Sequence, residues 1–431
     1  MDVVDFFGET VSRNFRRHPR FTRGLLRLGC AVQQRRLGAK RVDARLPSQI
    51  FLEQLSVRSM RMALSQPSRL ALVNMFAPAE LLHAMGLHPL CAEGFSSILS
   101  GGKCERGFLD YAAEHGVPET YCSYHRAFIG AVLAGLVPKP RFIVASSSVC
   151  DANTNTFRTV AAHYGVNEFY IDIPYEVTED SVCYVRRQLE DMVRHLEDGM
   201  GHRMDKGALM RAVRNTNASV EYQRKFIGEL ASRDFTNYVA AEMHRILVGH
   251  NLLGTDEART FFRMQYEDII GSSSGGVERC VGMHAHKRLL WCHVLPYYVE
   301  PLKEILDFSD RYTLLMSDLN YDQQVSIDET DILGSMARRL VTNHFNGSVE
   351  RRVASVTRMA KKLRADGAVI FCHWGCKHSN GGAFLLRNAL KAAEVDTLII
   401  DGDACDRRGT NAGQFATRLQ AFLEVLNGQS A

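Results

Sequence analysis

Two parts of the chain alternate short apolar segments with segments of helical periodicity. Apolar segments typical of buried strands lie at 88–92, 141–146 and 168–173, and again at 287–294, 312–317, 368–372 and 397–400. Helical segments separate them, among them 80–85, 127–136, 156–163 and 415–426. Strands that are apolar on both faces and alternate with helices are typical of parallel sheets covered on both sides. The sequence therefore predicts an α/β protein with two doubly wound parallel-sheet units of the Rossmann or flavodoxin type, plus a helical region.

The helical region lies between the two alternating parts. Residues 181–285 are charged and helically periodic, with few β-branched runs, and include the segments 222–230 and 237–247. We divide the chain into a basic helical segment (1–65), a first α/β domain (66–180), a helical layer (181–285) and a second α/β domain (286–431). The Gly-Ser-Ser-Ser-Gly-Gly stretch at 271–276 is expected to be a connecting loop, because no Lys-Ser/Thr follows it as in a phosphate-binding loop.

Composition excludes several classes of protein. The 431 residues are 46% hydrophobic, as in ordinary globular proteins, and the net charge of +4 does not predict nucleic acid or an anionic membrane as partner. The longest stretches without charged residues, 81–92 and 127–138, are shorter than the ~20 residues of a membrane span. No apolar signal core occurs in the first thirty residues and the eleven cysteines are an odd number, so we expect a cytoplasmic protein.

Basic residues are concentrated near the N-terminus. Between Arg13 and Arg45 the chain has eleven Lys or Arg and one acid, Asp43. A solvated basic helix explains this pattern, and a docking surface for an acidic partner protein is the alternative. No base-reading motif accompanies the charge, and neither G-x-x-x-x-G-K-S/T nor G-x-G-x-x-G occurs anywhere, so the chain has no recognisable nucleotide site of its own.

Three cysteines stand at positions where parallel sheets bind ligands. Cys122 precedes an apolar helix, and Cys150 and Cys376 each follow a predicted strand. We expect these three sulfurs to meet in the cleft between the domains, with pKa values lowered by helix N-termini. The remaining cysteines in apolar or helical surroundings are interpreted as packing residues; they are Cys30, Cys91, Cys183, Cys280 and Cys292.

Thiolates select zinc or iron-sulfur clusters, and a cluster held by three cysteines leaves one iron open to a non-protein ligand. The alternative from spacing is zinc bound by Cys372, His373, Cys376 and His378. Adjacent residues at a strand end point to opposite faces, which weighs against Cys372 and His373 binding one ion. Buried thiols beside turns, without any metal, are the simplest explanation of each cysteine taken alone.

Six separate motifs resemble a known family. They are Pro-Ala-Glu-Leu-Leu-His-Ala-Met-Gly-Leu-His-Pro at 78–89, Cys-Ser-Tyr-His-Arg at 122–126, Ala-Ser-Ser-Ser-Val-Cys-Asp at 145–151, Ile-Asp-Ile-Pro-Tyr at 171–175, His-Trp-Gly-Cys-Lys-His-Ser at 373–379 and Leu-Ile-Ile-Asp-Gly-Asp at 398–403. In this order they look like the motifs of the 2-hydroxyacyl-CoA dehydratase family, which includes the benzoyl-CoA reductase subunits, over about residues 70 to 427.

The resemblance implies a 4Fe-4S cluster held by Cys122, Cys150 and Cys376. It also implies a subunit that works as half of a dimer, with itself or with a paralogous second subunit, and a separate ATP-hydrolysing iron-sulfur activator that delivers one electron. The substrate would be an acyl-CoA. One electron would reduce a 2-hydroxyacyl thioester to a ketyl radical, from which hydroxide leaves the α carbon. The radical that remains would have an acidic β proton. The open iron would act as a Lewis acid on the substrate oxygen.

Five further residues are candidates for roles around such a cluster. Ser123, Ser148, His373 and His378 are predicted to donate hydrogen bonds to sulfur or substrate, with turn capping or core packing as the alternative. Glu80, in the motif Pro-x-Glu-Leu, is a candidate base or a carboxylate that stabilises a helix dipole.

One departure from the family pattern concerns the substrate. The chain has Asn74-Met-Phe-Ala before the Pro-x-Glu-Leu motif, where substrate-binding dehydratase subunits tend to have a small polar residue. The resemblance therefore extends to the double-cubane branch, in which a homodimer with an 8Fe-9S cluster reduces small molecules and the same three cysteines would serve. A third alternative is a non-catalytic electron-transfer or scaffold subunit.

Overall fold

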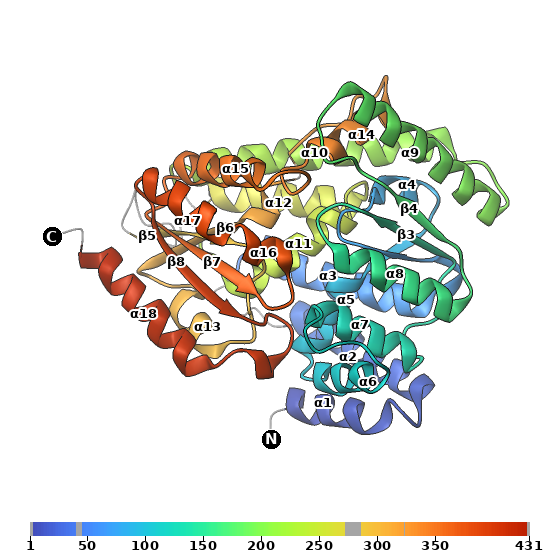
Figure 1. Cartoon of the computed structure of the whole chain (residues 1–431), viewed down its shortest axis with the longest axis horizontal. Coiled ribbons are helices and arrows are strands. Elements are labelled where there is room, and N and C mark those ends of the chain that lie inside the picture. The colour runs from blue at the N-terminus through green and yellow to red at the C-terminus, as the bar shows by residue number, and fades with distance from the viewer. Residues whose placement is uncertain (1–2, 40–44, 272–285, 323, 429–431) are drawn as a thin grey trace.

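The computed structural model describes residues 3–39, 45–271, 286–322 and 324–428 of the chain. It confirms the α/β class, with two four-stranded parallel sheets and helices packed around them (Figure 1). The first sheet has the order β2-β1-β3-β4. Its strands are β1 (Leu70–Val73), β2 (His88–Cys91), β3 (Phe142–Ser146) and β4 (Glu168–Ile171). Its helices are α4 (Ala79–Ala84), α5 (Ala92–Gly101), α6 (Glu105–Glu114), α7 (Ser123–Leu133) and α8 (Asp151–Tyr164).

The second sheet repeats this order as β6-β5-β7-β8. Its strands are β5 (Lys287–Cys292), β6 (Tyr312–Ser317), β7 (Gly367–His373) and β8 (Asp396–Gly402). The helices in this part of the chain are α13 (Glu300–Leu306), α14 (Ile332–Thr342), α15 (Val349–Lys362), α16 (Lys377–Gly381), α17 (Ala383–Ala392) and α18 (Ala412–Gly428). Short 3-10 helices lie at Pro67–Arg69, Asp318–Asn320 and Arg407–Gly409. Both sheets thus share the strand order with which flavodoxin-like folds begin.

Four helices connect the two sheets: α9 (Glu179–Met200), α10 (Lys206–Leu230), α11 (Val239–Asn251) and α12 (Asp256–Gly271). Caps fix where they begin, since Thr178 accepts a hydrogen bond from the Ser181 N–H and Asp205 accepts one from the Gly207 N–H. Helix α11 contacts β2 of the first unit and β6 of the second, so it joins the two. The expected loop at 271–276 lies outside the described residues beyond Gly271, as do Cys280 and His284.

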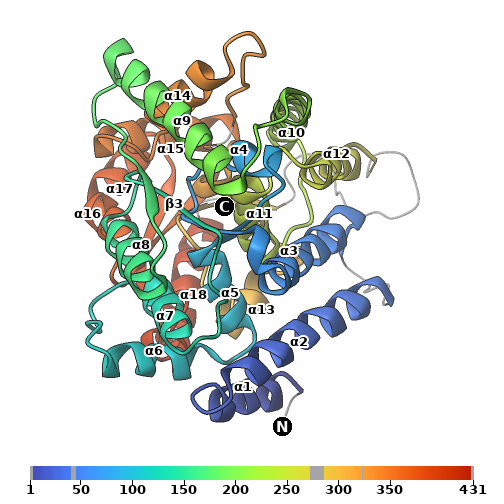
Figure 2. The ribbon, with the colours of Figure 1, turned by 90° about the vertical axis from the view of Figure 1, so that its right-hand side faces the viewer.

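Three helices precede the first sheet: α1 (Val3–Asn14), α2 (Pro19–Ala39) and α3 (Pro47–Ser65). Figure 2 shows α1 and α2 at one end of the molecule, with α3 beside them. The basic segment is thus helical over much of its length, and on α2 the arginines Arg20 and Arg27 are exposed. Docking of an acidic protein on this helix stays a prediction.

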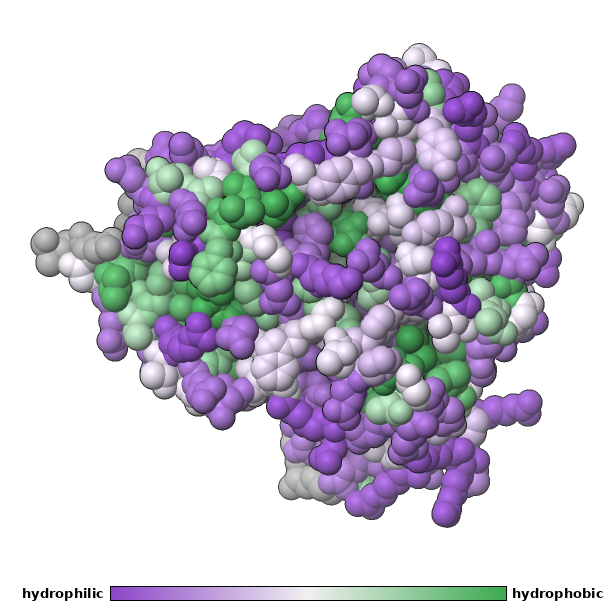
Figure 3. All heavy atoms as spheres, viewed as in Figure 1, coloured by the Kyte–Doolittle hydropathy of each residue, from purple (hydrophilic) through white to green (hydrophobic). Residues whose placement is uncertain are grey.

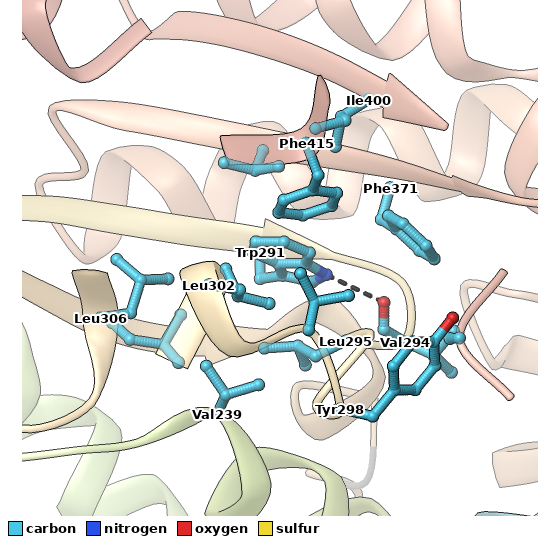
Figure 4. Close-up of a cluster of buried hydrophobic side chains, with 14 of the residues drawn as sticks. Val239, Trp291, Val294, Leu295, Tyr298, Leu302, Leu306, Phe371, Ile400 and Phe415 are labelled. Atoms are coloured by element: carbon cyan, nitrogen blue, oxygen red, sulfur yellow. Dashed lines mark hydrogen bonds between the residues drawn. The ribbon is translucent and has the colours of Figure 1, made fainter. Parts of the chain in front are cut away.

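Apolar side chains between the elements hold the second unit together. Trp291 of β5 is buried among Leu302, Phe371 and Phe415, and its indole N–H donates a 3.0 Å hydrogen bond to the carbonyl of Val294 (Figure 4). This bond fixes the chain just after β5, where the buried aromatic ring would otherwise leave a polar donor unsatisfied. The core therefore positions the loop that follows β5.

The surface is mostly polar. Figure 3 shows hydrophilic side chains over most of one face, with apolar side chains gathered over α17 and α18. Phe384 and Leu385 of α17 are exposed apolar residues. Among the helices of the described residues, none is both long enough and apolar enough to span a bilayer.

Candidate active site

The carboxyl ends of the inner strands of both sheets face one cavity of about 580 Å³. The loops after the neighbouring strands β1 and β3 contribute Phe76 and Cys150, and the loops after β5 and β7 contribute His293 and Cys376. These strand pairs are where the winding of each sheet changes direction, and open parallel sheets bind ligands at this switch point. The cavity is therefore the candidate active site.

Cys122, Cys150 and Cys376 all line this cavity. Each is the residue that caps the N-terminus of a helix: Cys122 for α7, Cys150 for α8 and Cys376 for α16. The structure thus brings together three cysteines that are far apart in sequence, two from the first unit and one from the second. Their role as ligands stays a prediction.

A glycine permits the two units to approach at this point. Gly375, directly before Cys376, has φ +76°, and a Cβ atom there would lie 2.7 Å from the backbone nitrogen of Cys122 and 2.8 Å from its Cα. Only glycine combines this backbone conformation with so close a contact. The Cys376 loop is therefore packed directly against the Cys122 turn.

Burial and neighbouring thiols affect the protonation of Cys122 and Cys150. Burial raises the pKa of Cys122 well above its usual range, and Cys150 and Cys376 raise it further. Burial, followed by the effect of Cys376, raises the pKa of Cys150 to about 12. The expectation that helix N-termini lower the thiol pKa is wrong for Cys122 and Cys150, because burial outweighs the backbone N–H groups. Deprotonating the thiols together requires a cationic partner, which a bound metal centre supplies.

The donor set of three thiolates fits an iron-sulfur cluster. Among the described residues, no group of three or more His, Cys, Asp or Glu side chains is spaced to hold one ion. In an iron-sulfur cluster each thiolate binds a different iron, so the sulfurs stand further apart than in a tetrahedral zinc site. Three cysteines around one cavity, with Cys150 and Cys376 close enough to raise the pKa of Cys122, suit that arrangement.

The zinc hypothesis finds no support in the described residues. The Cys372 thiol belongs to the core beneath α17 and points toward the carbonyl of Ser379 at 3.9 Å. The His373 ring lies on the opposite face of β7, with its Nε2 3.4 Å from the sulfur of Cys122. The alternation of side chains along the strand therefore separates the two.

His373 is a predicted site residue that the structure places at a cysteine. Its Nδ1 accepts a 3.1 Å hydrogen bond from the Ala404 N–H, so a neutral ring carries its proton on Nε2, which faces Cys122. Burial lowers the pKa of His373, which favours this neutral form.

His378 also lines the cavity, but its ring is engaged elsewhere. Nε2 donates to the carbonyl of Phe345 at 3.2 Å, and Nδ1 accepts from Arg352 at 3.4 Å. Burial, followed by the charge of Arg352, lowers the pKa of His378 to about 4.

The remaining predicted residues do not line the cavity. The Ser123 hydroxyl donates a 2.6 Å hydrogen bond to Asp403, which ties α7 to the loop after β8. The hydroxyl of Ser148 is buried without a hydrogen-bond partner among the described residues. Glu80 is paired with Arg339 at 2.8 Å and accepts from Thr216. Burial raises the pKa of Glu80, but the pairing with Arg339 outweighs it, so the net shift is downward and the carboxylate is a weak base.

Two histidines at the cavity were not predicted. His125, on α7, has its Nε2 3.9 Å from the sulfur of Cys150, and His293, after β5, has its Nε2 3.6 Å from the sulfur of Cys376. His125 stands within the Cys-Ser-Tyr-His-Arg motif, one helical turn after Cys122. This spacing could have indicated that His125 lies on the same side of the helix as Cys122. No motif surrounds His293.

Part of the cavity wall is apolar. Helix α11 contributes Met243, Ile246 and Leu247, and the loop after β1 contributes Phe76. At the end of α11, Asn251 is only 2% exposed, and both side-chain polar atoms of this residue lack a hydrogen-bond partner among the described residues. A buried amide without partners at a cavity wall is suited to bind a polar group of a ligand.

Comparison with known proteins identifies the family. The family model "2-hydroxyglutaryl-CoA dehydratase, D-component" matches residues 74–426. The chain is 21% identical to the (R)-phenyllactyl-CoA dehydratase alpha subunit of Clostridium sporogenes, covering 81% of this chain and 87% of that protein. It is 23% identical to the lactoyl-CoA dehydratase subunit alpha of Anaerotignum propionicum, covering 82% and 90%.

A third relative is the (R)-2-hydroxyisocaproyl-CoA dehydratase alpha subunit of Clostridioides difficile, 19% identical over 81% of this chain and 88% of that protein. The resemblance inferred from the six motifs is thereby confirmed. With a family model matched over most of its length, the chain belongs to the 2-hydroxyglutaryl-CoA dehydratase D-component family and is a dehydratase-type enzyme subunit.

Proposed function

We propose that this protein is the iron-sulfur subunit of a 2-hydroxyacyl-CoA dehydratase that eliminates water with a single electron. The observation that carries the proposal is the meeting of Cys122, Cys150 and Cys376 on one cavity at the switch points of both sheets. A 4Fe-4S cluster held by these cysteines would supply the single electron and an iron open to a substrate oxygen. The named relatives, all dehydratase alpha subunits, support a substrate of the acyl-CoA class.

Two partners belong to the proposal. The electron would come from a separate ATP-hydrolysing activator, in keeping with a sequence that has no phosphate-binding loop of the P-loop type. The relatives named as alpha subunits support a second, paralogous subunit, with a homodimer as the alternative. We place the enzyme in the cytoplasm, where thiols stay reduced.

The chain's own residues would bind and shield the acyl group. The apolar wall of Phe76, Met243 and Ile246 would contact the carbon chain and exclude water from it. The amide of Asn251 would bind a polar atom of the substrate. Among the described residues that line the cavity, the only Lys or Arg is Lys377, which is 89% exposed and paired with Asp151 at 3.2 Å. The cavity therefore suits an uncharged acyl chain.

This proposal predicts a substrate preference. With activator, ATP and reductant under anaerobic conditions, an aliphatic 2-hydroxyacyl-CoA should give the unsaturated thioester. 2-Hydroxyglutaryl-CoA should show kcat/KM lower by roughly 100-fold, because its free distal carboxylate would be buried without a cation (about 3 kcal/mol). Product formation by chromatography measures both. Iron-loaded protein that converts neither thioester would contradict the proposed function.

Asn251→Leu tests the binding role of the amide. Loss of one hydrogen bond to substrate, about 1.4 kcal/mol, should raise KM about tenfold and leave kcat within a factor of two. Asn388→Leu, on the exposed face of α17, is the matched control and should change neither constant. An unchanged KM for Asn251→Leu would show that this amide does not contact substrate.

A further inference from the structure

Each of the three cysteines has a histidine ring beside its sulfur. His373 faces Cys122 at 3.4 Å, His293 faces Cys376 at 3.6 Å and His125 faces Cys150 at 3.9 Å, in every case through Nε2. The three histidines come from different elements, namely the ends of β7 and β5 and the first turn of α7. The pairing of one imidazole with each thiol is thus made by the fold as a whole.

For His373, the hydrogen bond on the far side of the ring supports donation toward sulfur. The Ala404 N–H occupies Nδ1 of His373, which leaves the proton on Nε2. For His125, Nδ1 lies 3.0 Å from the Thr156 hydroxyl, while Nε2 lies 3.9 Å from both Cys150 and Glu93. The rings of His293 and His373 are nearly parallel, with centroids 6.3 Å apart.

The backbone of His293 is held in a costly conformation. Its φ is +82°, a region that residues other than glycine rarely occupy. The Asp318 carboxylate accepts a 2.6 Å hydrogen bond from the backbone N–H of His293, and the Ser317 hydroxyl donates a 2.8 Å hydrogen bond to the backbone carbonyl of His293. Nδ1 of the ring is buried without a partner among the described residues. Backbone strain that is maintained by surrounding hydrogen bonds is typical of functional positions. Here the strained backbone directs the His293 ring toward Cys376.

We propose that His373, His293 and His125 are positioning residues that donate N–H hydrogen bonds to the sulfurs of the bound cluster and raise its reduction potential. This inference rests on the proposed function, which supplies the cluster. A hydrogen bond to sulfur stabilises the more negative, reduced form, so donors around the cluster set the potential at which it accepts an electron. His378 lines the same cavity, but its two ring nitrogens are hydrogen-bonded to Phe345 and Arg352. It therefore donates no hydrogen bond to a cluster sulfur.

The test is a potentiometric titration of anaerobically purified protein, followed by EPR, with iron analysis of each sample. His373→Leu should retain iron and lower the midpoint potential by about 59 mV, which is a tenfold change in a one-electron equilibrium. His373→Gln keeps an N–H donor near the position of Nε2 and should restore most of the shift. His293→Asn, whose residue type tolerates a positive φ, should also lower the potential. His378→Leu is the matched control and should leave the potential unchanged.

The outcomes separate this inference from the proposed function. Iron-loaded variants of His373 and His293 with the wild-type potential would overturn the hydrogen-bonding role and leave the proposed function standing. An equal shift in His378→Leu would also overturn it, because the effect would then follow from changes in the cavity rather than from donation to sulfur. If a variant does not retain iron, the rate of alkylation of Cys122 in the iron-free protein tests the hydrogen bond instead. A lower alkylation rate in His373→Leu than in His373→Gln supports donation to the Cys122 sulfur. Equal rates refute it. Wild-type protein without iron would overturn both proposals.

Discussion

Cys150→Ala should lose its bound iron completely. The Cys150 sulfur lies on the cavity wall at the N-cap of α8, and two remaining cysteines cannot hold a cluster that three hold in the proposed site. Purification under anaerobic conditions, with iron and acid-labile sulfide measured per chain, gives the result. Dehydratase activity should fall below detection in the same sample.

Cys183→Ala is the control for this loss. Cys183 lies exposed on α9 and does not line the cavity, so its removal should leave iron content and activity at wild-type levels. Both variants should unfold within a few degrees of iron-free wild type, because truncating one small side chain costs about 1 kcal/mol. Full iron content in Cys150→Ala would refute the ligand assignment.

Gly375→Val should destabilise the protein and disturb the same centre. The new Cβ would meet the Cys122 backbone at 2.7 Å, and valine would have to adopt φ +76°. Overpacking and left-handed backbone strain together should cost about 2–5 kcal/mol of unfolding free energy. The strain is relieved only by moving the Cys376 loop away from Cys122, so iron retention should fall as well. Urea unfolding and iron analysis measure the two effects.

Gly381→Ala is the matched control for this substitution. Gly381 lies a few residues further on, at the end of α16, where an added Cβ meets nothing within 4 Å and φ is not positive. Stability should change by less than about 1 kcal/mol, and iron content should stay unchanged. A Gly375→Val protein with wild-type stability and iron would show that the approach of the two units at this point is not needed.

Periodicity in the sequence was sufficient to predict most of the fold. Long apolar strands such as Tyr312–Ser317 were recognisable because burial on both faces leaves an uninterrupted apolar run. β1 (Leu70–Val73) was missed, although it is an inner strand of the first sheet, because the nearby Pro67 obscures where the strand begins. The packing of α14 against α9 was also not predicted, since contacts across sequence separations of this size leave no periodic signal.

The candidate site was predictable only where chemistry and topology act together. Cys150 and Cys376 follow strands, and the rule that ligands bind at the carboxyl ends of parallel strands placed them in one cleft. His293 carries no such signal, because its orientation depends on a backbone conformation fixed by Ser317 and Asp318. Glu80 matched a family motif, yet its partner Arg339 comes from α14, whose position the sequence did not reveal.

Iron and acid-labile sulfide in wild-type protein purified without oxygen test the central claim most directly. We expect about four irons and four sulfides per chain. A larger, coupled cluster in a homodimer would favour the double-cubane reductase over the dehydratase while keeping the three cysteines as ligands. Colourless, iron-free protein from an anaerobic preparation, with all three thiols open to alkylation, would contradict the account.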